Sequence, residues 1–97
     1  MKINVTDQAM VFFEAEFDTE RTPNIRLFAK YGGDSNIHHG FSVGITAELP
    51  EDPIVTVKVG DLNFYVEETD YWYFDGYDWN IDYDKKTDLL DFGPIVS

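Results

Sequence analysis

The first part of the chain changes from a strand pattern to a helical one. Met1–Val5 alternates apolar and polar residues, which predicts a short strand. Thr6 can accept hydrogen bonds from the free N–H groups of a helix start, and Asp7 suits the positive end of the helix dipole. Hydrophobic residues follow at helical spacing, at Ala9, Met10, Phe13 and Phe17. These features predict one helix over about residues 7–17, which ends before Pro23.

From Asn24 the hydrophobic period becomes two, the period of a β-strand. A strand of about eight residues is predicted there, because apolar side chains occupy every second position, at Ile25, Leu27, Ala29 and Tyr31. A second alternating run, residues 41–46, predicts the next strand. Pro50 and Pro53 then bracket an exposed acidic loop.

The clearest hairpin of the sequence joins Ile54–Val59 to Leu62–Val66. The two residues between these runs, Gly60–Asp61, fit a tight primed turn in which glycine takes a positive φ. Glu67–Phe74 follows as a short predicted helix, and Gly76 is available to end it in a left-handed conformation.

The C-terminal part contains one more predicted strand, Tyr77–Tyr83, and then a packed tail, Leu89–Pro94. The sum is about six strands and two helices, with the helices outside a mostly antiparallel β-structure. The sequence therefore predicts an α+β fold, a compact mixed sandwich or partial barrel with about two flanking helices. Residues 1–97 are expected to form a single domain.

Composition and charge narrow the classes of function. Hydrophobic residues make up 43% of the 97 residues, which is enough for a packed core. The chain has no cysteine, so it has no thiolate metal site and no thiol nucleophile. The formal net charge of −12 repels phosphate backbones and anionic lipids, so we expect no nucleic-acid and no membrane partner. Basic proteins or cations are the expected partners, and the expected location is the cytoplasm.

The segment Tyr31–Phe41 holds both histidines of the chain together with an aspartate. If Asp34 and His38 lie on one side of the loop, their oxygen and nitrogen atoms can bind a divalent ion. His39 contributes only if the loop is irregular, because neighbours in a strand point to opposite faces. Asp34, His38 and His39 are therefore the candidate metal ligands. The alternative is a surface loop whose histidines are solvated or hydrogen-bonded locally.

An acidic, aromatic stretch over residues 67–84 is the second candidate site. Its seven carboxylates include Asp82 and Asp84, which would share one strand face. Carboxylate oxygens suit calcium, yet the spacing differs from that of an EF-hand loop. Aromatic rings between charges more often pack on one side and face water on the other. Hydrolase, phosphate-binding and dinucleotide-binding motifs are absent from the sequence, so no enzymatic activity is expected.

The order and spacing of several segments resemble the HesB/IscA-like family, the A-type iron–sulfur cluster biosynthesis proteins. The pattern is most similar to that of the small HesB-like proteins of low-GC Gram-positive bacteria. The segments that carry this resemblance are Ile3–Ala9, Tyr31–Gly33, Gly40–Ile45, Phe64–Val66, Trp72–Gly76 and Ile81–Tyr83. The resemblance implies a HesB-like fold, a compact mixed β-structure with flanking helices.

The same resemblance limits what activity can be carried over. The family's carriers ligate iron or a cluster through three cysteines, usually across a dimer or tetramer. The first cysteine follows the glycine pair, where this chain has Asp34. The other two form a Cys-x-Cys near the C-terminus, about where this sequence has Gly93–Ser97. The fold is therefore expected to carry over, whereas a cysteine-ligated cluster is not.

Three functions remain as hypotheses at this point. The leading one is a non-enzymatic accessory or binding module related to iron–sulfur cluster assembly, able to form a homodimer. The second is a binder of iron or another divalent metal through Asp34 and His38. The third is a protein-interaction module whose acidic, aromatic surface around Tyr71–Tyr77 meets a basic partner.

Overall fold

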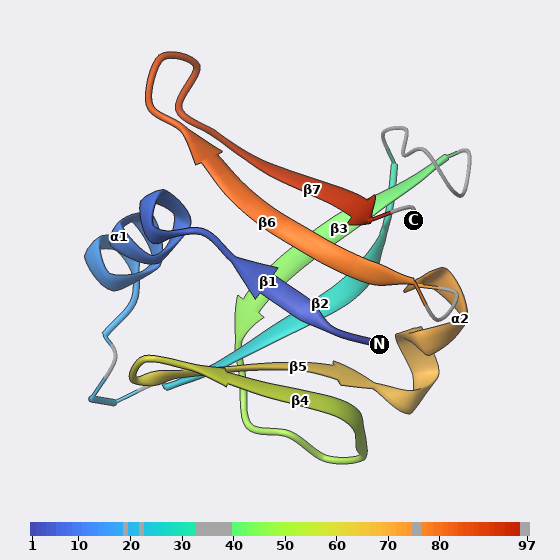
Figure 1. Cartoon of the computed structure of the whole chain (residues 1–97). Helices are drawn as coiled ribbons and strands as arrows, with labels where there is room; N and C mark the ends of the chain where they lie inside the picture. Colours follow the sequence, from blue (N-terminus) through green and yellow to red (C-terminus); the bar gives the residue numbers. More distant parts are fainter. Residues whose placement is uncertain (19, 22, 33–39, 75–76, 96–97) are drawn as a thin grey trace.

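The computed structural model of the chain describes residues 1–18, 20–21, 23–32, 40–74 and 77–95 (Figure 1). Within these ranges the chain forms strands, two α-helices and one 3₁₀ turn. In chain order the elements are β1 (Ile3–Val5), α1 (Asp7–Glu16), β2 (Asn24–Tyr31), β3 (Phe41–Ala47), β4 (Pro53–Val59), β5 (Leu62–Glu67), the 3₁₀ turn (Glu68–Asp70), α2 (Tyr71–Phe74), β6 (Asp78–Asp84) and β7 (Leu89–Ile95).

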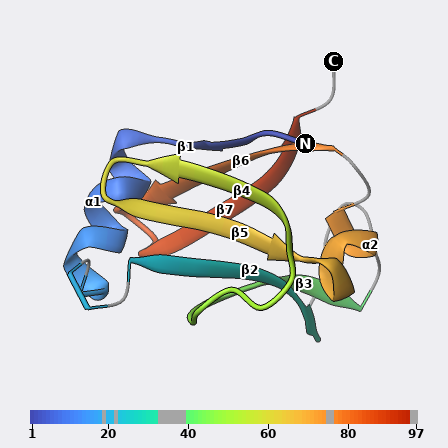
Figure 2. The same cartoon turned by 90° about the horizontal axis from the view of Figure 1, so that it is seen from below.

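The strands form two sheets, one with the order β1-β6-β7 and the other with the order β3-β2-β5-β4. Three strand pairs are antiparallel, and the pairs β1·β6 and β2·β5 are parallel. The two sheets face each other, with α1 beside one open side and α2 near the opposite end (Figures 1 and 2). The predicted α+β class and the mixed, mostly antiparallel sandwich are confirmed, and the described strands do not close into a barrel.

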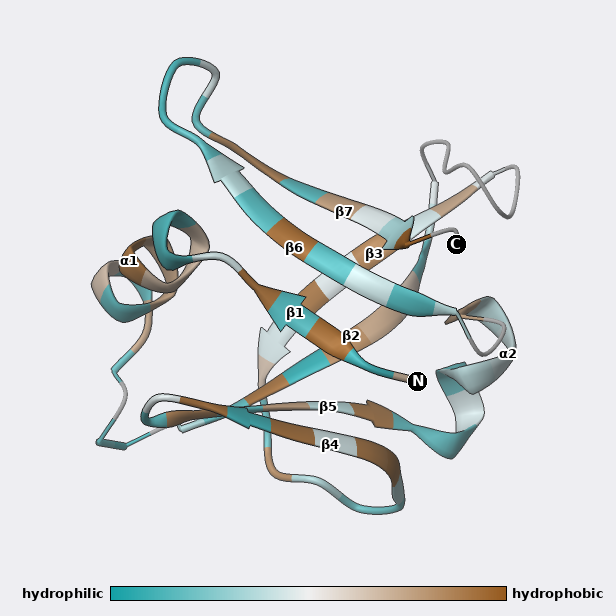
Figure 3. Cartoon of the chain, in the orientation of Figure 1, coloured by the Kyte–Doolittle hydropathy of each residue, from teal (hydrophilic) through white to brown (hydrophobic). Residues whose placement is uncertain are grey.

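The core lies between the sheets because each strand places alternate apolar side chains inward. Along β6 the residues Trp79 and Ile81 are buried, and polar residues alternate with them (Figure 3). Helix α1 closes this core from the side. Its Phe13 ring lies 5.1 Å from the ring of Phe64 in β5, in an edge-to-face arrangement. Helix α1 thereby packs against both sheets, since the neighbouring Phe12 stacks on Tyr83 of β6.

The start of α1 agrees with the sequence prediction. The Thr6 hydroxyl oxygen accepts a hydrogen bond from the amide of Ala9 at 3.2 Å, as expected of an N-cap residue. The same hydroxyl donates to Asp82 Oδ1 at 2.7 Å, which ties the helix start to β6. Among the described helices, none is long and apolar enough to cross a bilayer.

Two predicted elements differ from the structure. The predicted tail Leu89–Pro94 is wrong, because these residues lie in β7, paired antiparallel with β6. The segment contains Pro94, which is tolerated because β7 is at the edge of its sheet. The predicted helix Glu67–Phe74 is shorter than expected: Glu67 is the last residue of β5, and the next turn is 3₁₀. Pairing of Glu67 with Pro53 keeps it in the strand.

Candidate functional site

The predicted ligands Asp34, His38 and His39 lie outside the described residues. The strands on either side of that segment are described. Tyr31 of β2 is opposite Phe41 of β3, and the amide of Gly32 donates to the carbonyl of Gly40 at 2.8 Å. Gly32 and Gly40 have φ values of +110° and +86°, a conformation that favours glycine. The strands β2 and β3 thus pair up to the residues that flank the segment.

An exposed set of rings lies next to this strand end. The Tyr31 ring is 5.7 Å from that of Phe41, which is 5.3 Å from that of Trp72 in α2; both contacts are edge-to-face. Tyr31 is 86% exposed and Trp72 is 49% exposed. We call Tyr31, Phe41 and Trp72 the aromatic row. Trp72 belongs to the predicted acidic, aromatic surface, whereas Tyr31 and Phe41 do not. The pairing of β2 with β3 places Tyr31 opposite Phe41, whose ring contacts Trp72.

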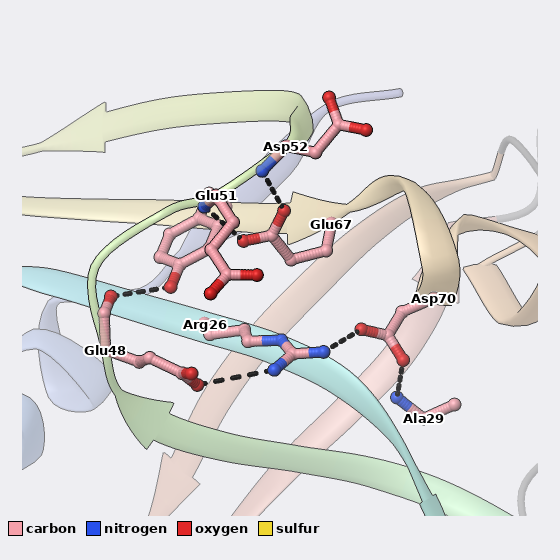
Figure 4. Close-up of polar contacts among 8 residues, drawn as sticks. Arg26, Ala29, Glu48, Glu51, Asp52, Glu67 and Asp70 are labelled. Carbon is pink, nitrogen blue, oxygen red and sulfur yellow. Dashed lines mark hydrogen bonds and ion pairs between the residues drawn. The ribbon is translucent and has the colours of Figure 1, made fainter.

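A connected polar network lies on the outer face of the β3-β2-β5-β4 sheet (Figure 4). Arg26 of β2 donates from Nη2 to Asp70 Oδ2 at 2.6 Å and from Nη1 to Glu48 Oε2 at 3.3 Å. The other oxygen of Asp70 accepts from the amide of Ala29 at 3.3 Å. The hydrogen bond with Asp70 is the main reason why the pKa of Arg26 is raised above its ordinary value.

The second half of this network fixes the loop of residues 48–52, which we call the acidic loop. Glu67 is only 7% exposed, and its carboxylate accepts hydrogen bonds from the amides of Glu51 at 2.8 Å and Asp52 at 2.7 Å. The hydroxyl of Tyr65 donates to the carbonyl of Glu48 at 2.5 Å. Burial, followed by the negative charge of Glu48, raises the pKa of Tyr65, so this hydroxyl stays protonated as a donor. Both ends of the acidic loop are therefore attached to the sheet.

Sequence reasoning missed Arg26, Glu67 and Asp70 as a connected group. Arg26 and Tyr65 are brought side by side by the parallel pairing of β2 with β5, two strands that are not consecutive in sequence. The signal that could have indicated the network is Arg26, a charged residue within a predicted strand, at a position that alternates with the hydrophobic ones. Such a residue needs an acidic partner when its strand is half-buried.

A hollow of about 430 Å³ lies between the start of α1 and the β6–β7 hairpin. Asp82 and Asp84 both line it, as expected from their shared strand face, and Asp91 lines it from β7. Asp82 is directly opposite Asp91 in the ladder, and like charges in such a pair repel. Within the described ranges, no three His, Cys, Asp or Glu residues are grouped so as to hold a metal ion.

The fold of this chain has a match among solved structures. The fold matches that of Escherichia coli SufA, a protein involved in the biosynthesis of iron–sulfur clusters, with a TM-score of 0.62. The match covers 96% of this chain and 80% of SufA at 14% sequence identity. This chain therefore has a SufA-like α+β fold, as the resemblance to HesB/IscA-like proteins implied.

The family follows from sequence relatives. The chain is 34% identical to the pyruvate dehydrogenase inhibitor of Bacillus subtilis over 88 residues, which is 91% of this chain and 93% of that protein. It is 36% identical to uncharacterised proteins of several Staphylococcus aureus strains over 78 residues, or 77% of this chain and 80% of theirs. No model of a known protein family matches the sequence. This chain belongs to the family of the B. subtilis protein.

Proposed function

We propose that this protein is a non-enzymatic inhibitor that binds to pyruvate dehydrogenase. The observation that carries the proposal is the relationship to the B. subtilis pyruvate dehydrogenase inhibitor, at 34% identity over 93% of that protein. A relationship that covers 91% of this chain and 93% of that protein supports a shared mode of action.

Surface chemistry supports a role in protein binding. The aromatic row presents a tyrosine and a tryptophan at the surface, and these residue types contribute most of the binding energy in many interfaces. The net charge of −12 adds an attraction for basic partner surfaces that speeds association at low salt. The proposal agrees with the predicted protein-interaction module and names pyruvate dehydrogenase as its partner.

The test is a titration of pyruvate dehydrogenase activity. The enzyme is purified from the organism that encodes this chain and assayed by NADH formation from pyruvate, with B. subtilis pyruvate dehydrogenase assayed alongside. We expect a saturable fall in rate as this protein is added, and E. coli SufA serves as a control of similar fold. An unchanged rate at a large excess of this protein over both enzymes would contradict the proposal.

A second proposal is an accessory role in iron–sulfur cluster assembly, with a basic assembly protein as partner and a homodimer as the assembling unit. The SufA-like fold favours it. In this proposal the module carries no cysteine-ligated cluster, since the sequence has no cysteine. Anaerobic incubation with iron and sulfide, followed by absorption spectroscopy, tests it. A stoichiometric sulfur-to-iron charge-transfer band would rule out this cluster-free role.

A further inference from the structure

The acidic loop presents one hydrophobic side chain to solvent. Leu49 is 76% exposed and lies between Glu48 and Pro50, with the exposed carboxylates of Glu51 and Asp52 following. A single exposed leucine needs no explanation on an ordinary surface. Leu49 differs because the residues before and after it in the loop are hydrogen-bonded to the sheet.

The attachments restrict the conformation in which Leu49 is displayed. On one side, the amide of Glu48 donates to the carbonyl of Asn24 at 3.3 Å, and its carbonyl accepts from Tyr65 at 2.5 Å. On the other side, Glu67 holds the two amides that follow Pro50. Proline fixes its own φ and restricts the residue before it, which is Leu49. The leucine is therefore held on a short segment between two fixed points.

Preorganisation of this kind favours binding, because less conformational entropy is lost when the loop meets its partner. Exposed loops are usually less ordered than the strands that they connect. Glu67 is a buried residue, and both of its carboxylate oxygens accept hydrogen bonds from loop amides. Charged residues are seldom buried, so it is unusual for one to fix the shape of a surface loop.

The charges around Leu49 define the chemistry of the partner. Glu48, Glu51 and Asp52 are exposed, and the neighbouring guanidinium, Arg26, is already bonded to Glu48 and Asp70. A hydrogen bond between the carboxyl groups of Glu68 and Asp52, followed by the negative charge of Asp52, raises the pKa of Glu68. A partner surface with basic residues complements this arrangement.

We propose that the acidic loop is the segment through which this protein binds pyruvate dehydrogenase, with Leu49 seated in an apolar pocket whose rim carries lysine or arginine. The inference rests on the proposed function and adds to it the contacting residues. A hollow of about 280 Å³ leaves room for a side chain of the partner to pack against Leu49. It is lined by Arg21, Pro23, Asn24, Ala47, Glu48 and Leu49, so its rim carries one positive and one negative side chain of this protein.

The experiment compares two matched leucine substitutions. Leu49→Ala is expected to raise the concentration for half-inhibition of pyruvate dehydrogenase by about tenfold or more. Leu89→Ala removes a leucine of similar exposure, 65%, from β7, and is expected to change that concentration by less than about twofold. Thermal unfolding of both variants checks that they remain folded.

A third variant tests the attachment of the loop. Glu67→Gln retains the size of the side chain but leaves one oxygen to accept from the two amides. We expect faster hydrogen exchange at the amides of Glu51 and Asp52, together with a rise of about threefold or more in the half-inhibiting concentration. Unchanged inhibition in Glu67→Gln with faster exchange at these amides would overturn the preorganisation part of the inference.

The outcomes separate the inference from the proposed function. If the wild type does not inhibit, the proposed function fails, and this inference fails with it. If the wild type inhibits and Leu49→Ala inhibits equally well, only the loop contact is overturned. A large loss in Trp72→Ala or Leu89→Ala, with none in Leu49→Ala, would move the contact to the aromatic row or to the hollow beside β7.

Discussion

Asp70, in the 3₁₀ turn after β5, accepts a hydrogen bond at 2.6 Å from Nη2 of Arg26 in β2. The Asp70 side chain is 12% exposed, so the pair is shielded from water and salt more than a surface ion pair. Because Asp70 also accepts from the amide of Ala29, it joins the turn to two points along one strand. The turn leads directly into α2, which carries Trp72.

The first prediction concerns this pair. Asp70→Asn retains the shape of the side chain but removes the nearer of the two negative charges that pair with Arg26, so we expect the free energy of unfolding to fall by about 2 kcal/mol. Urea denaturation measures the change. Asp61→Asn, in the exposed turn between β4 and β5, is the matched control and should change stability by less than about 0.5 kcal/mol. Equal effects of the two substitutions would contradict the structural role of Asp70.

A second prediction concerns the close contact between Gly44 of β3 and Phe28 of β2, which are paired in the ladder. A methyl group on Gly44 would lie 2.7 Å from Cε2 of the Phe28 ring, well inside van der Waals contact. Gly44→Ala is therefore expected to destabilise the protein by about 1–3 kcal/mol. Urea denaturation measures the loss.

The control for this substitution is another strand glycine. A methyl group on Gly93 of β7 meets nothing within 4 Å, so Gly93→Ala should leave stability unchanged within about 0.5 kcal/mol. Phe28→Ala combined with Gly44→Ala should show a favourable coupling, because the clash then has no partner. A Gly44→Ala variant as stable as Gly93→Ala would show that the ring moves aside without penalty.

The sequence predicts those parts of the fold that depend on neighbouring residues. The capped start of α1 at Thr6 and the strand β2 follow from local spacing and side-chain chemistry, and both are confirmed. The strand β7 was missed because Gly93 and Pro94 weaken the strand pattern. A glycine and a proline are tolerated in β7 because it is an edge strand. Whether a strand lies at an edge depends on the whole sheet and cannot be read from the segment alone.

The polar network around Arg26 could not be predicted from neighbouring residues either, because it also depends on which strands pair. Arg26 and Asp70 are separated by 44 residues and meet only because β2 pairs parallel with β5. Glu67 was predicted as the first residue of a helix. In the structure its carboxylate instead accepts hydrogen bonds from two amides of the acidic loop. Long-range pairing decides such contacts, and hydrophobic periodicity carries no information about which strands become neighbours.

The third prediction concerns metal binding by Asp34 and His38. If Asp34 and His38 bind a divalent ion, Fe(II) or Zn(II) titrated into the wild type should bind with a defined stoichiometry, because carboxylate and imidazole suit these ions. The Asp34→Ala/His38→Ala variant should bind at least about tenfold more weakly. A His39→Ala variant tests whether the second histidine takes part. Equally weak, millimolar binding by wild type and variants would remove the metal hypothesis.

The last prediction concerns the pKa of Asp82. The Thr6 hydroxyl donates to Asp82 Oδ1 at 2.7 Å, and the amide of Tyr83 donates to the same oxygen at 2.8 Å. These bonds, the Thr6 bond first, lower the pKa of Asp82 below its ordinary value, since they favour the ionised carboxylate. The stabilisation is therefore complete above the unfolded-state pKa of about 4 and is lost as the pH falls through the lowered folded-state pKa.

Thr6→Val removes the donor, so the pKa of Asp82 should rise toward its ordinary value, whereas Thr6→Ser retains the hydroxyl and should keep the pKa low. Carbon NMR of the Asp82 carboxyl group across an acid titration measures the pKa in each variant. The stability difference between wild type and Thr6→Val should be constant near neutral pH and narrow in acid. It should not vanish, because the lost cap on Ala9 does not depend on pH. The same Asp82 pKa in Thr6→Val and wild type would show that the Thr6 bond does not control this carboxylate.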